Sequence, residues 1–237
     1  MRLTLRQRAS WLAHLFKASA QQHHLPLREA FRSHIPDDAV VVDIGAHAGQ
    51  FSKLFARMAP RGTVYAFEPS AYARSILEPA LRWNGIGNVR LTPAGLSDGV
   101  GQTVLHTPIK RSGSMGFGTA HMGGVPAATH HEQGVVLTTL DAFASTEKLT
   151  RLDFIKADIE GWELRALKGG EATIRRFRPA LYLEVDAACL VRAGDTPEDL
   201  FDWLGGLGYS AFASPDHRPV SAWQGAGDYL FVATEKP

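Results

Sequence analysis

The stretch VVVDIGAHAGQF, residues 40–51, decides how the rest of the chain is arranged. Its opening run is apolar and β-branched without alternation, which predicts a strand buried on both faces. Gly45 and Gly49 suit a tight turn that passes close to a ligand. From residue 50 the pattern predicts a helix, with the apolar residues Phe51, Leu54, Phe55 and Met58 on one face. A strand, a glycine turn and a helix N-terminus together predict the nucleotide-binding corner of an open α/β sheet.

The glycine spacing narrows the class of nucleotide. Gly45 and Gly49 form G-x-x-x-G, so the dinucleotide fingerprint G-x-G-x-x-G is absent here. With Asp43 the pattern becomes D-x-G-x-x-x-G, which is similar to the motif of methyltransferases that use S-adenosylmethionine (SAM). Taken alone, the pattern also fits an ordinary strand-to-helix turn that binds nothing.

A second strand ends in an acid one strand-helix-strand unit later. Residues 63–69 read TVYAFEP, so Glu68 lies at the carboxyl end of this strand and Pro69 stops it. In nucleotide-binding folds an acid ~20 residues beyond the glycine turn accepts hydrogen bonds from ribose. A carboxylate suits the ribose diol because it only accepts. We therefore expect Glu68 to bind the cofactor, the alternative being a solvated acid at a strand end.

Length and composition limit the classes of protein. A chain of 237 residues with 45% hydrophobic content predicts one α/β domain with one core. The net charge of +1 gives no reason to expect nucleic acid or an acidic membrane as partner. Cys189 is the only cysteine, which excludes internal disulfides and cysteine-based zinc sites. No apolar run approaches the ~20 residues of a membrane span. No signal-peptide core is evident, so a cytoplasmic location is expected.

Two segments fall outside the strand-helix rhythm. Residues 1–36 read as an N-terminal helical segment with a basic amphipathic stripe, expected to pack on its own domain or on a second subunit in a homodimer. A membrane surface is the alternative. Residues 99–137 contain short strands at 103–107 and 135–138 around a Gly-, Ser- and His-rich stretch. We interpret this segment as a lid or substrate-binding insertion, whose histidines either bind metal, act as base or have no role.

A third acid-bearing strand is the best candidate for chemistry. Residues 153–163 read DFIKADIEGWE, and alternation places Lys156, Asp158 and Glu160 on one face if the strand continues that far. Such groups are costly to bury unless they are partnered, so a structural salt bridge to Lys156 is the alternative. Backbone near Leu96 and Ser97, after the strand at 89–94, is expected to contact adenine or to form a plain turn.

Together these motifs resemble the FkbM family of class I SAM-dependent methyltransferases, over residues 40 to about 186. The D-x-E-G-x-E motif is the most specific of them. Family members commonly have Asn where His47 stands, so His47 is expected to alter the methionine end of the site. The motifs that carry the resemblance are residues 43–51 (DIGAHAGQF), 66–69 (AFEP), Asn88 with 94–98 (AGLSD), 139–141 (TLD) and 155–163 (IKADIEGWE).

The resemblance implies a single-domain, Rossmann-like α/β fold over residues 37–237. Its sheet would have seven mainly parallel strands with an antiparallel last strand, and helices on both faces. It also implies O-methylation of a hydroxyl on a sugar, glycolipid or secondary metabolite, with S-adenosylhomocysteine as product. The residues expected to bind the cofactor are Asp43, Gly45, His47, Gly49, Phe51, Glu68, Pro69, Leu96, Ser97 and Asp158.

The chemistry is expected to rest on Asp158 or Glu160 as base, with Lys156 beside them. A metal bridged by these acids and Glu184 is a further option, and carboxylate ligands would favour Mg²⁺ or Ca²⁺.

Two other classes stay open. One is a SAM-dependent N-methyltransferase of protein or RNA, although the near-neutral charge argues against RNA. The other is a non-catalytic binding module that has the same fold. Several carboxylates at strand ends argue against a pure scaffold, because a scaffold has no need of them.

Overall fold

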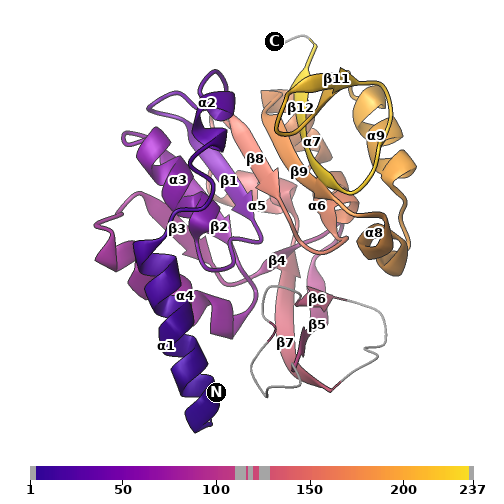
Figure 1. Ribbon diagram of the computed structural model, residues 1–237. Helices are drawn as coiled ribbons and strands as arrows, with labels where there is room; N and C mark the ends of the chain where they lie inside the picture. The colour runs from indigo at the N-terminus through magenta and orange to yellow at the C-terminus, as the bar shows by residue number, and fades with distance from the viewer. Residues whose placement is uncertain (1–3, 110–115, 117–119, 123–128, 235–237) are drawn as a thin grey trace.

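The computed structural model describes residues 4–109, 116, 120–122 and 129–234 (Figure 1). Strands and helices alternate along most of the chain, as the pattern predicts. The helices are α1 (Leu5–Ala20), α2 (Leu27–Phe31), α3 (Gln50–Met58), α4 (Ala71–Trp83), α5 (Leu140–Thr146), α6 (Glu163–Lys168), α7 (Glu171–Phe177), α8 (Ala187–Ala193) and α9 (Pro197–Gly206). The strands are β1 (Val40–Ile44), β2 (Thr63–Phe67), β3 (Val89–Thr92), β4 (Gly95–Leu96), β5 (Gly101–Pro108), β6 (His121–Met122), β7 (His130–Thr138), β8 (Phe154–Ala157), β9 (Ala180–Val185), β10 (Tyr209–Ala213), β11 (Arg218–Val220) and β12 (Gly227–Ala233).

The main sheet is mixed and has the strand order β11-β10-β12-β9-β8-β1-β2-β3. Strands β9, β8, β1, β2 and β3 run parallel, whereas β12 is antiparallel to both β9 and β10. The expected antiparallel last strand is therefore present. The expected count of seven strands is wrong, because the short β11 adds an eighth strand at the edge.

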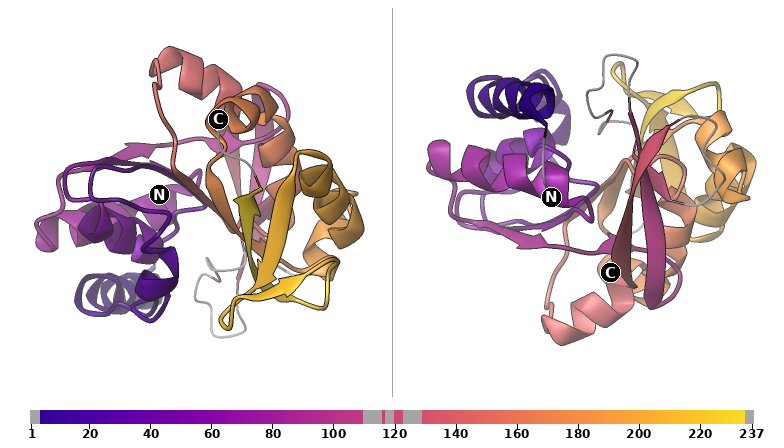
Figure 2. Two further views of the ribbon diagram at one scale, coloured as in Figure 1. Left: turned by 90° about the horizontal axis from the view of Figure 1, so that it is seen from above. Right: turned by 90° about the horizontal axis from the view of Figure 1, so that it is seen from below.

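Both faces of this sheet are covered by helices (Figure 2), and the side chains of each strand alternate between two cores. On β1, Val42 and Ile44 belong to the core that contains residues of α5, α6, α7 and α9. Val41 belongs to the other core, with Phe31 of α2 and residues of α3. Because apolar side chains are needed on both faces, β1 reads as a continuous apolar run.

A smaller sheet with the order β4-β7-β5-β6 is built from the expected insertion. The short strands predicted at 103–107 and 135–138 are confirmed as parts of β5 and β7, which form a long antiparallel pair. Most of the glycine-rich stretch between them lies outside the described residues. Leu105, Met122, Val135 and Leu137 make a small apolar core on one face of this sheet.

The N-terminal segment packs on its own domain. The side chain of Thr4 caps α1 together with Gln7. Trp11 Nε1 on α1 donates a hydrogen bond of 2.9 Å to Ser75 Oγ on α4. Lys53 Nζ donates to the carbonyl oxygens of Ala18 and, at 2.9 Å, Gln21. The contacts of Lys53 hold the end of α1 and the residues that follow it against α3.

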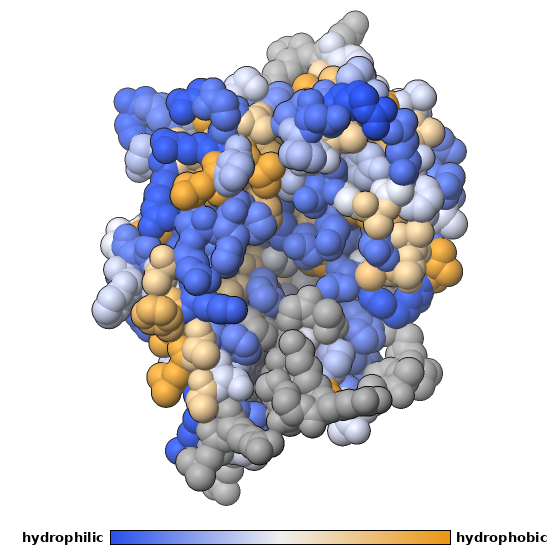
Figure 3. Space-filling view, in the orientation of Figure 1, coloured by the Kyte–Doolittle hydropathy of each residue, from blue (hydrophilic) through white to orange (hydrophobic). Residues whose placement is uncertain are grey.

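An apolar strip remains exposed on α1, where Leu12 and Phe16 are 60% and 70% accessible (Figure 3). The homodimer through this helix stays a prediction. Within the described part of the chain, no helix has both the length and the apolarity that crossing a membrane requires.

Strand β8 is shorter than the alternation suggests. It ends at Ala157, and Glu160 and Gly161 have positive φ angles of 57° and 100°. A Cβ on Gly161 would lie 2.1 Å from the carbonyl oxygen of Cys189, so the chain must turn here without a side chain. The strand therefore does not continue far enough for Lys156, Asp158 and Glu160 to share a strand face, and the two acids lie in the turn before α6.

Candidate functional site

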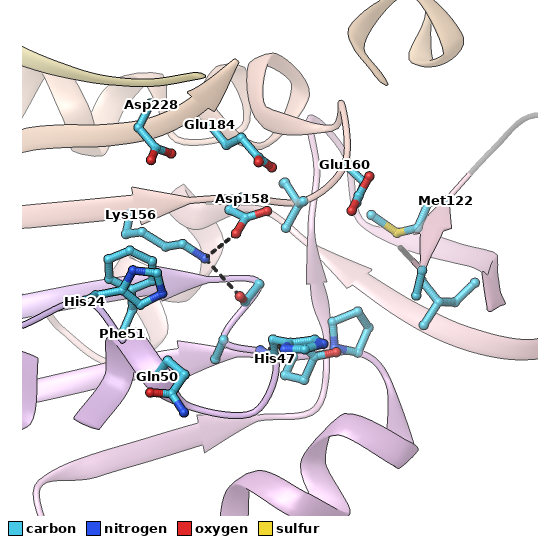
Figure 4. A pocket seen from close by; sticks show the side chains of 17 residues that line it. His24, His47, Gln50, Phe51, Met122, Lys156, Asp158, Glu160, Glu184 and Asp228 are labelled. Atoms are coloured by element: carbon cyan, nitrogen blue, oxygen red, sulfur yellow. Dashed lines mark hydrogen bonds and ion pairs between the residues drawn. The ribbon is translucent and has the colours of Figure 1, made fainter. Parts of the chain in front are cut away.

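A cavity of about 290 Å³ lies at the carboxyl ends of β1, β2, β8 and β9 (Figure 4). The parallel register places Ile44, Phe67 and Ala157 at this one edge of the sheet. Side chains of β5 and β6 close the cavity from the small sheet, through Leu105 and Met122. The predicted site residues that line it are Gly45, His47, Phe51, Glu68, Pro69, Lys156, Asp158 and Glu160.

The glycine turn is held rigidly between two strands. The N–H groups of Gly45 and Ala46 both donate to the carbonyl oxygen of Phe67 at 3.0 Å. Gly45 has a φ of 75°, and a Cβ there would lie 2.2 Å from the carbonyl oxygen of Asp158. Glycine is required because neighbouring backbone fills the space of a side chain. The turn therefore presents bare backbone to the cavity.

Glu68 has the geometry expected of a ribose acceptor. Its side chain accepts hydrogen bonds from the N–H of His47 at 2.7 Å and of Ser70 at 2.8 Å, one on each oxygen. Each oxygen keeps acceptor capacity for a second donor. Glu68 is 6% exposed, and this burial raises its pKa to about 7, although the backbone donors oppose the rise. A ligand that donates two hydrogen bonds would favour the ionised carboxylate.

Asp43 lies beneath the turn rather than on the cavity wall. Its buried carboxylate accepts a 2.5 Å hydrogen bond from Ser52 Oγ and lies 3.7 Å from Lys156 Nζ. Burial raises the pKa of Asp43, and Lys156 opposes the rise. The role of Asp43 in this structure is to anchor the lysine under the glycine turn. Its contact with the cofactor stays a prediction.

Lys156 links the turn to the acid at the end of β8. Its Nζ donates to the carbonyl oxygen of Gly45 at 3.0 Å and lies 3.5 Å from Asp158 Oδ2. Burial lowers the pKa of Lys156, but the carboxylates of Asp158 and Asp43 outweigh burial and raise it. The salt bridge that the sequence left open is thus present. The ammonium group stays charged and orients Asp158.

Asp158 projects into the cavity, where its side chain is 42% exposed (Figure 4). This exposure is to the cavity, so protein surrounds the carboxylate on most sides. Burial raises the pKa of Asp158, but Lys156 and the neighbouring Glu184 more than offset burial and lower it. Burial, followed by Asp158, raises the pKa of Glu184 to about 8. At neutral pH the pair therefore holds one proton between its two carboxyl groups, and the opposite directions of the two pKa shifts favour Glu184 as its carrier.

Glu160 lies at the rim of the cavity and faces α8. Its carboxylate accepts a hydrogen bond of 3.4 Å from Cys189 Sγ and lies 3.9 Å from a guanidinium nitrogen of Arg192. Burial raises the pKa of Glu160. Among the described residues, Asp158, Glu160 and Glu184 do not bring three donor atoms within 4.8 Å of one another. The structure gives no support for the expected magnesium or calcium site.

The sequence reasoning missed the role of Glu163. This buried acid accepts hydrogen bonds from the N–H groups of Ile159 at 2.7 Å and Gly161 at 3.3 Å. Burial raises its pKa to about 7, against those backbone donors. Glu163 thus ties down the turn that carries Asp158. The sequence contained this residue as the last acid of D-x-E-G-x-E, but nothing in the motif indicates that its carboxylate turns back to the N–H groups of the preceding turn.

Two further cavity residues come from distant parts of the chain. His24, between α1 and α2, stacks on Phe51 with ring centroids 4.0 Å apart and an interplanar angle of 14°. Burial, followed by Lys156, lowers the pKa of His24. Asp228 of β12 pairs in register with Glu184 of β9. The expected antiparallel last strand is the one feature of the sequence that points to Asp228 as a cavity residue. No sequence pattern indicates that His24 lines the cavity.

Three other predicted contacts lie away from the cavity wall. Leu96 is buried in the main core, and Ser97 Oγ accepts a hydrogen bond of 3.1 Å from Trp162 Nε1. Gly49 is the N-cap residue before α3 and has a φ of 82°, and a Cβ there would lie 2.1 Å from a methyl carbon of Leu77. These residues shape the elements around the cavity. Their contact with a cofactor stays a prediction.

Comparison with known proteins identifies the family. The family model described as "Methyltransferase FkbM domain" matches residues 43–211. Among curated proteins, "Methyltransferase 1" of Beauveria bassiana (strain ARSEF 2860) is 25% identical over 147 residues, 56% of this chain and 59% of that protein. "Methyltransferase sdnD" of Sordaria araneosa is 25% identical over 172 residues, 60% of this chain and 66% of that protein. The chain therefore spans less than two thirds of the length of either relative.

Solved structures share the fold. A methyltransferase FkbM from Methylobacillus flagellatus KT superposes with a TM-score of 0.53 at 18% identity, over 96% of this chain and 59% of that one. The cofactor-bound Rv0187 from MTB also gives 0.53, at 14% identity, over 98% and 92%. Because the family match covers most of the sequence and includes both the glycine turn and D-x-E-G-x-E, this chain belongs to the FkbM family of SAM-dependent methyltransferases.

Proposed function

We propose that this protein is an O-methyltransferase whose cavity binds SAM together with a hydroxyl group of a sugar, glycolipid or secondary metabolite. The observation that carries the proposal is the ionised Asp158, which faces the same cavity as Glu68 and is oriented by Lys156. A base within reach of a bound acceptor is what a hydroxyl needs, because it is a poor nucleophile near pH 7.

The residues at this edge of the sheet fit the cofactor. Glu68 keeps two acceptor sites for a ribose diol, and the bare backbone of Gly45 leaves room beside it. The carboxylate of Glu160 also lines the cavity and suits a positively charged ligand. When bound, SAM would supply an electrophilic methyl group, which the acceptor oxygen attacks in line, so that the C–O bond forms as the C–S bond breaks and S-adenosylhomocysteine leaves.

Side chains of the protein accept the proton of the acceptor hydroxyl and hold the acceptor in position for attack. Asp158 accepts the proton of the hydroxyl while Lys156 holds the carboxylate in place through its hydrogen bond to Gly45. Glu184 retains its own proton at neutral pH and so leaves Asp158 charged. Holding the acceptor in one orientation beside the methyl group supplies much of the rate.

The lining also favours one class of acceptor. The acids Asp158, Glu160, Glu184 and Asp228 bring four carboxyl groups to one cavity, two from the turn after β8 and one each from β9 and β12. Hydroxyl groups donate hydrogen bonds to such a surface, whereas the phosphates of RNA are repelled by it. A cavity of about 290 Å³ suits small molecules. These features support a hydroxylated small molecule over RNA.

An acceptor panel tests this assignment. Methyl-labelled SAM is incubated with the protein and with sugars, other polyhydroxylated compounds, amines without hydroxyls, a peptide and RNA. We expect label on oxygen in a hydroxylated compound. Label only on nitrogen, in the amines, peptide or RNA, would replace this proposal with the N-methyltransferase alternative.

The Glu68→Ala variant is expected to bind SAM about 100-fold more weakly, because two hydrogen bonds to a charged acceptor are lost. Calorimetric titration measures the change. Glu78→Ala, which removes an exposed acid from α4, serves as matched control and keeps the affinity of the wild type. Wild-type affinity in a folded Glu68→Ala protein would show that the ribose contact lies elsewhere.

A pH dependence follows from Glu184. Its pKa of about 8 means that raising the pH through this value adds a second negative charge beside Asp158. The added charge raises the proton affinity of Asp158 and makes it a stronger base. We expect the rise in kcat/KM to be centred near pH 8 and to level off about one pH unit higher. In Glu184→Gln this rise should disappear, and a rise of unchanged shape in that variant would exclude Glu184 as its cause.

A further inference from the structure

A cluster of metal-ligand side chains lies on the small sheet, apart from the methyltransferase cavity. His106 is on β5, and His130 and Glu132 are on β7. The antiparallel register pairs His106 with Glu132, and His130 is two residues from Glu132. Since side chains two apart in a strand share a face, all three project from the same side of the sheet.

The spacing of the donor atoms fits a metal ion. His130 Nε2 lies 3.0 Å and His106 Nδ1 3.8 Å from Glu132 Oε1, and the three donors lie within 4.8 Å of one another. Ligand atoms ~2.1 Å from a tetrahedral zinc ion are about 3.4 Å apart. The two measured distances lie on either side of this value.

His106 gives the second, independent observation. Its side chain is 13% exposed, and Nδ1 is buried without a hydrogen-bond partner among the described residues. The hydrogen bond between His130 and Glu132 accounts for those two side chains but leaves this nitrogen unsatisfied. A buried polar atom without a partner is unfavourable and rare, and here it belongs to the cluster. A bound cation would satisfy it.

We propose that His106, His130 and Glu132 bind a Zn²⁺ ion or a similar first-row divalent metal. Two imidazoles and a carboxylate are a donor set typical of zinc, and Mg²⁺ and Ca²⁺ prefer sites made of oxygen atoms. His121 pairs with His106 across β5 and β6, with ring centroids 6.0 Å apart. The fourth position is thus close to a further imidazole, and water can also fill it.

The site has a structural role in this arrangement. Leu105 and Met122, each adjacent in sequence to a histidine of this face, line the methyltransferase cavity from the opposite face of the sheet. A metal that joins β5 to β7 fixes the position of that wall. The binding of the metal does not depend on which acceptor the enzyme methylates.

The test is metal binding by the untagged, full-length protein after removal of metals with a chelator. Zn²⁺ is titrated in competition with a chromophoric chelator, and Co²⁺ by its visible absorption. The variants are His106→Ala, His130→Gln and Glu132→Gln, and the last alters an exposed side chain that the fold does not need. His131→Ala is the matched control, because this neighbour on β7 projects from the other face.

We expect one equivalent of Zn²⁺ and a tetrahedral Co²⁺ spectrum for wild type and His131→Ala. Each cluster variant should bind more than about 100-fold more weakly, since changes outside the ligands already cost 10- to 100-fold. Circular dichroism confirms that each variant is folded. The proposal is overturned if wild type binds no metal at micromolar concentrations, or if a folded Glu132→Gln or His106→Ala protein binds it as wild type does.

Discussion

The Asp158→Asn variant is expected to lose turnover by about 10²- to 10⁴-fold and to keep its affinity for SAM, because general-base catalysis contributes rate enhancements of this size. Asparagine preserves the volume of the side chain but cannot take the proton of the acceptor. Lys156 keeps its hydrogen bond to the carbonyl oxygen of Gly45 at 3.0 Å and its 3.7 Å contact with Asp43, so the turn should stay folded. Single-turnover rates and calorimetric titration of SAM measure the two effects separately.

Glu160→Gln is the comparison that assigns the base. The carboxylate of Glu160 lies at the rim of the cavity and contacts Cys189 and Arg192. We therefore expect Glu160→Gln to reduce turnover by less than about tenfold. Near-normal turnover in Asp158→Asn, with a large loss in Glu160→Gln, would transfer the role to Glu160. Loss of SAM binding in Asp158→Asn would instead make Asp158 a cofactor contact.

The Glu163→Ala variant is expected to lose about 3 kcal/mol of the free energy of unfolding. The substitution leaves the buried N–H groups of Ile159 and Gly161 without their acceptor, at about 1–3 kcal/mol each in the worst case, and opens a cavity. Denaturant unfolding at pH 7 measures the change. Glu171→Ala is the control, because its exposed ion pair with Arg175 is worth less than about 0.5 kcal/mol.

Glu163→Gln separates the hydrogen bonds from the charge. The amide oxygen of Gln can accept the same bonds, whereas the buried carboxyl has a pKa raised from 4.5 to about 7. A raised pKa in the folded state gives stability that is present below pH 4.5 and is lost as the pH rises through about 7. Glu163→Gln should therefore match wild type near pH 4 and exceed it at pH 8, by at most about 3 kcal/mol. A variant less stable than wild type at pH 8 would contradict this.

The first half of the site follows from local sequence. Three features carry it: the apolar run of β1, the positive φ at Gly45 and the acid that follows β2. They are adjacent in the chain or separated by a single helix. Each is determined by backbone sterics and by the period of the apolar residues, which a sequence displays directly. Because the carboxyl ends of parallel strands meet at one edge, the sequence predicts Glu68 and Asp158 at one site.

The division of roles among the acids did not follow from sequence. Asp43 and Glu163 read as cofactor or motif residues, yet both are buried beneath the cavity wall and hold Lys156 and the turn after β8. Which acids after β8 face the cavity depends on the path of the turn that follows this strand. The backbone of Cys189, far along the chain, packs closely against Gly161 in that turn.

The sequence by itself determined the α/β class, the glycine turn, the acids at the strand ends and the family, because these depend on residues close together in the chain. Only the tertiary structure decided which side chains share the cavity. His24 reaches it because α1 packs on α4, and Asp228 because β12 pairs antiparallel with β9. The cluster of His106 and Glu132 likewise depends on the register of β5 against β7. Such pairings result from packing and strand register between distant segments, and no local pattern of residues encodes them.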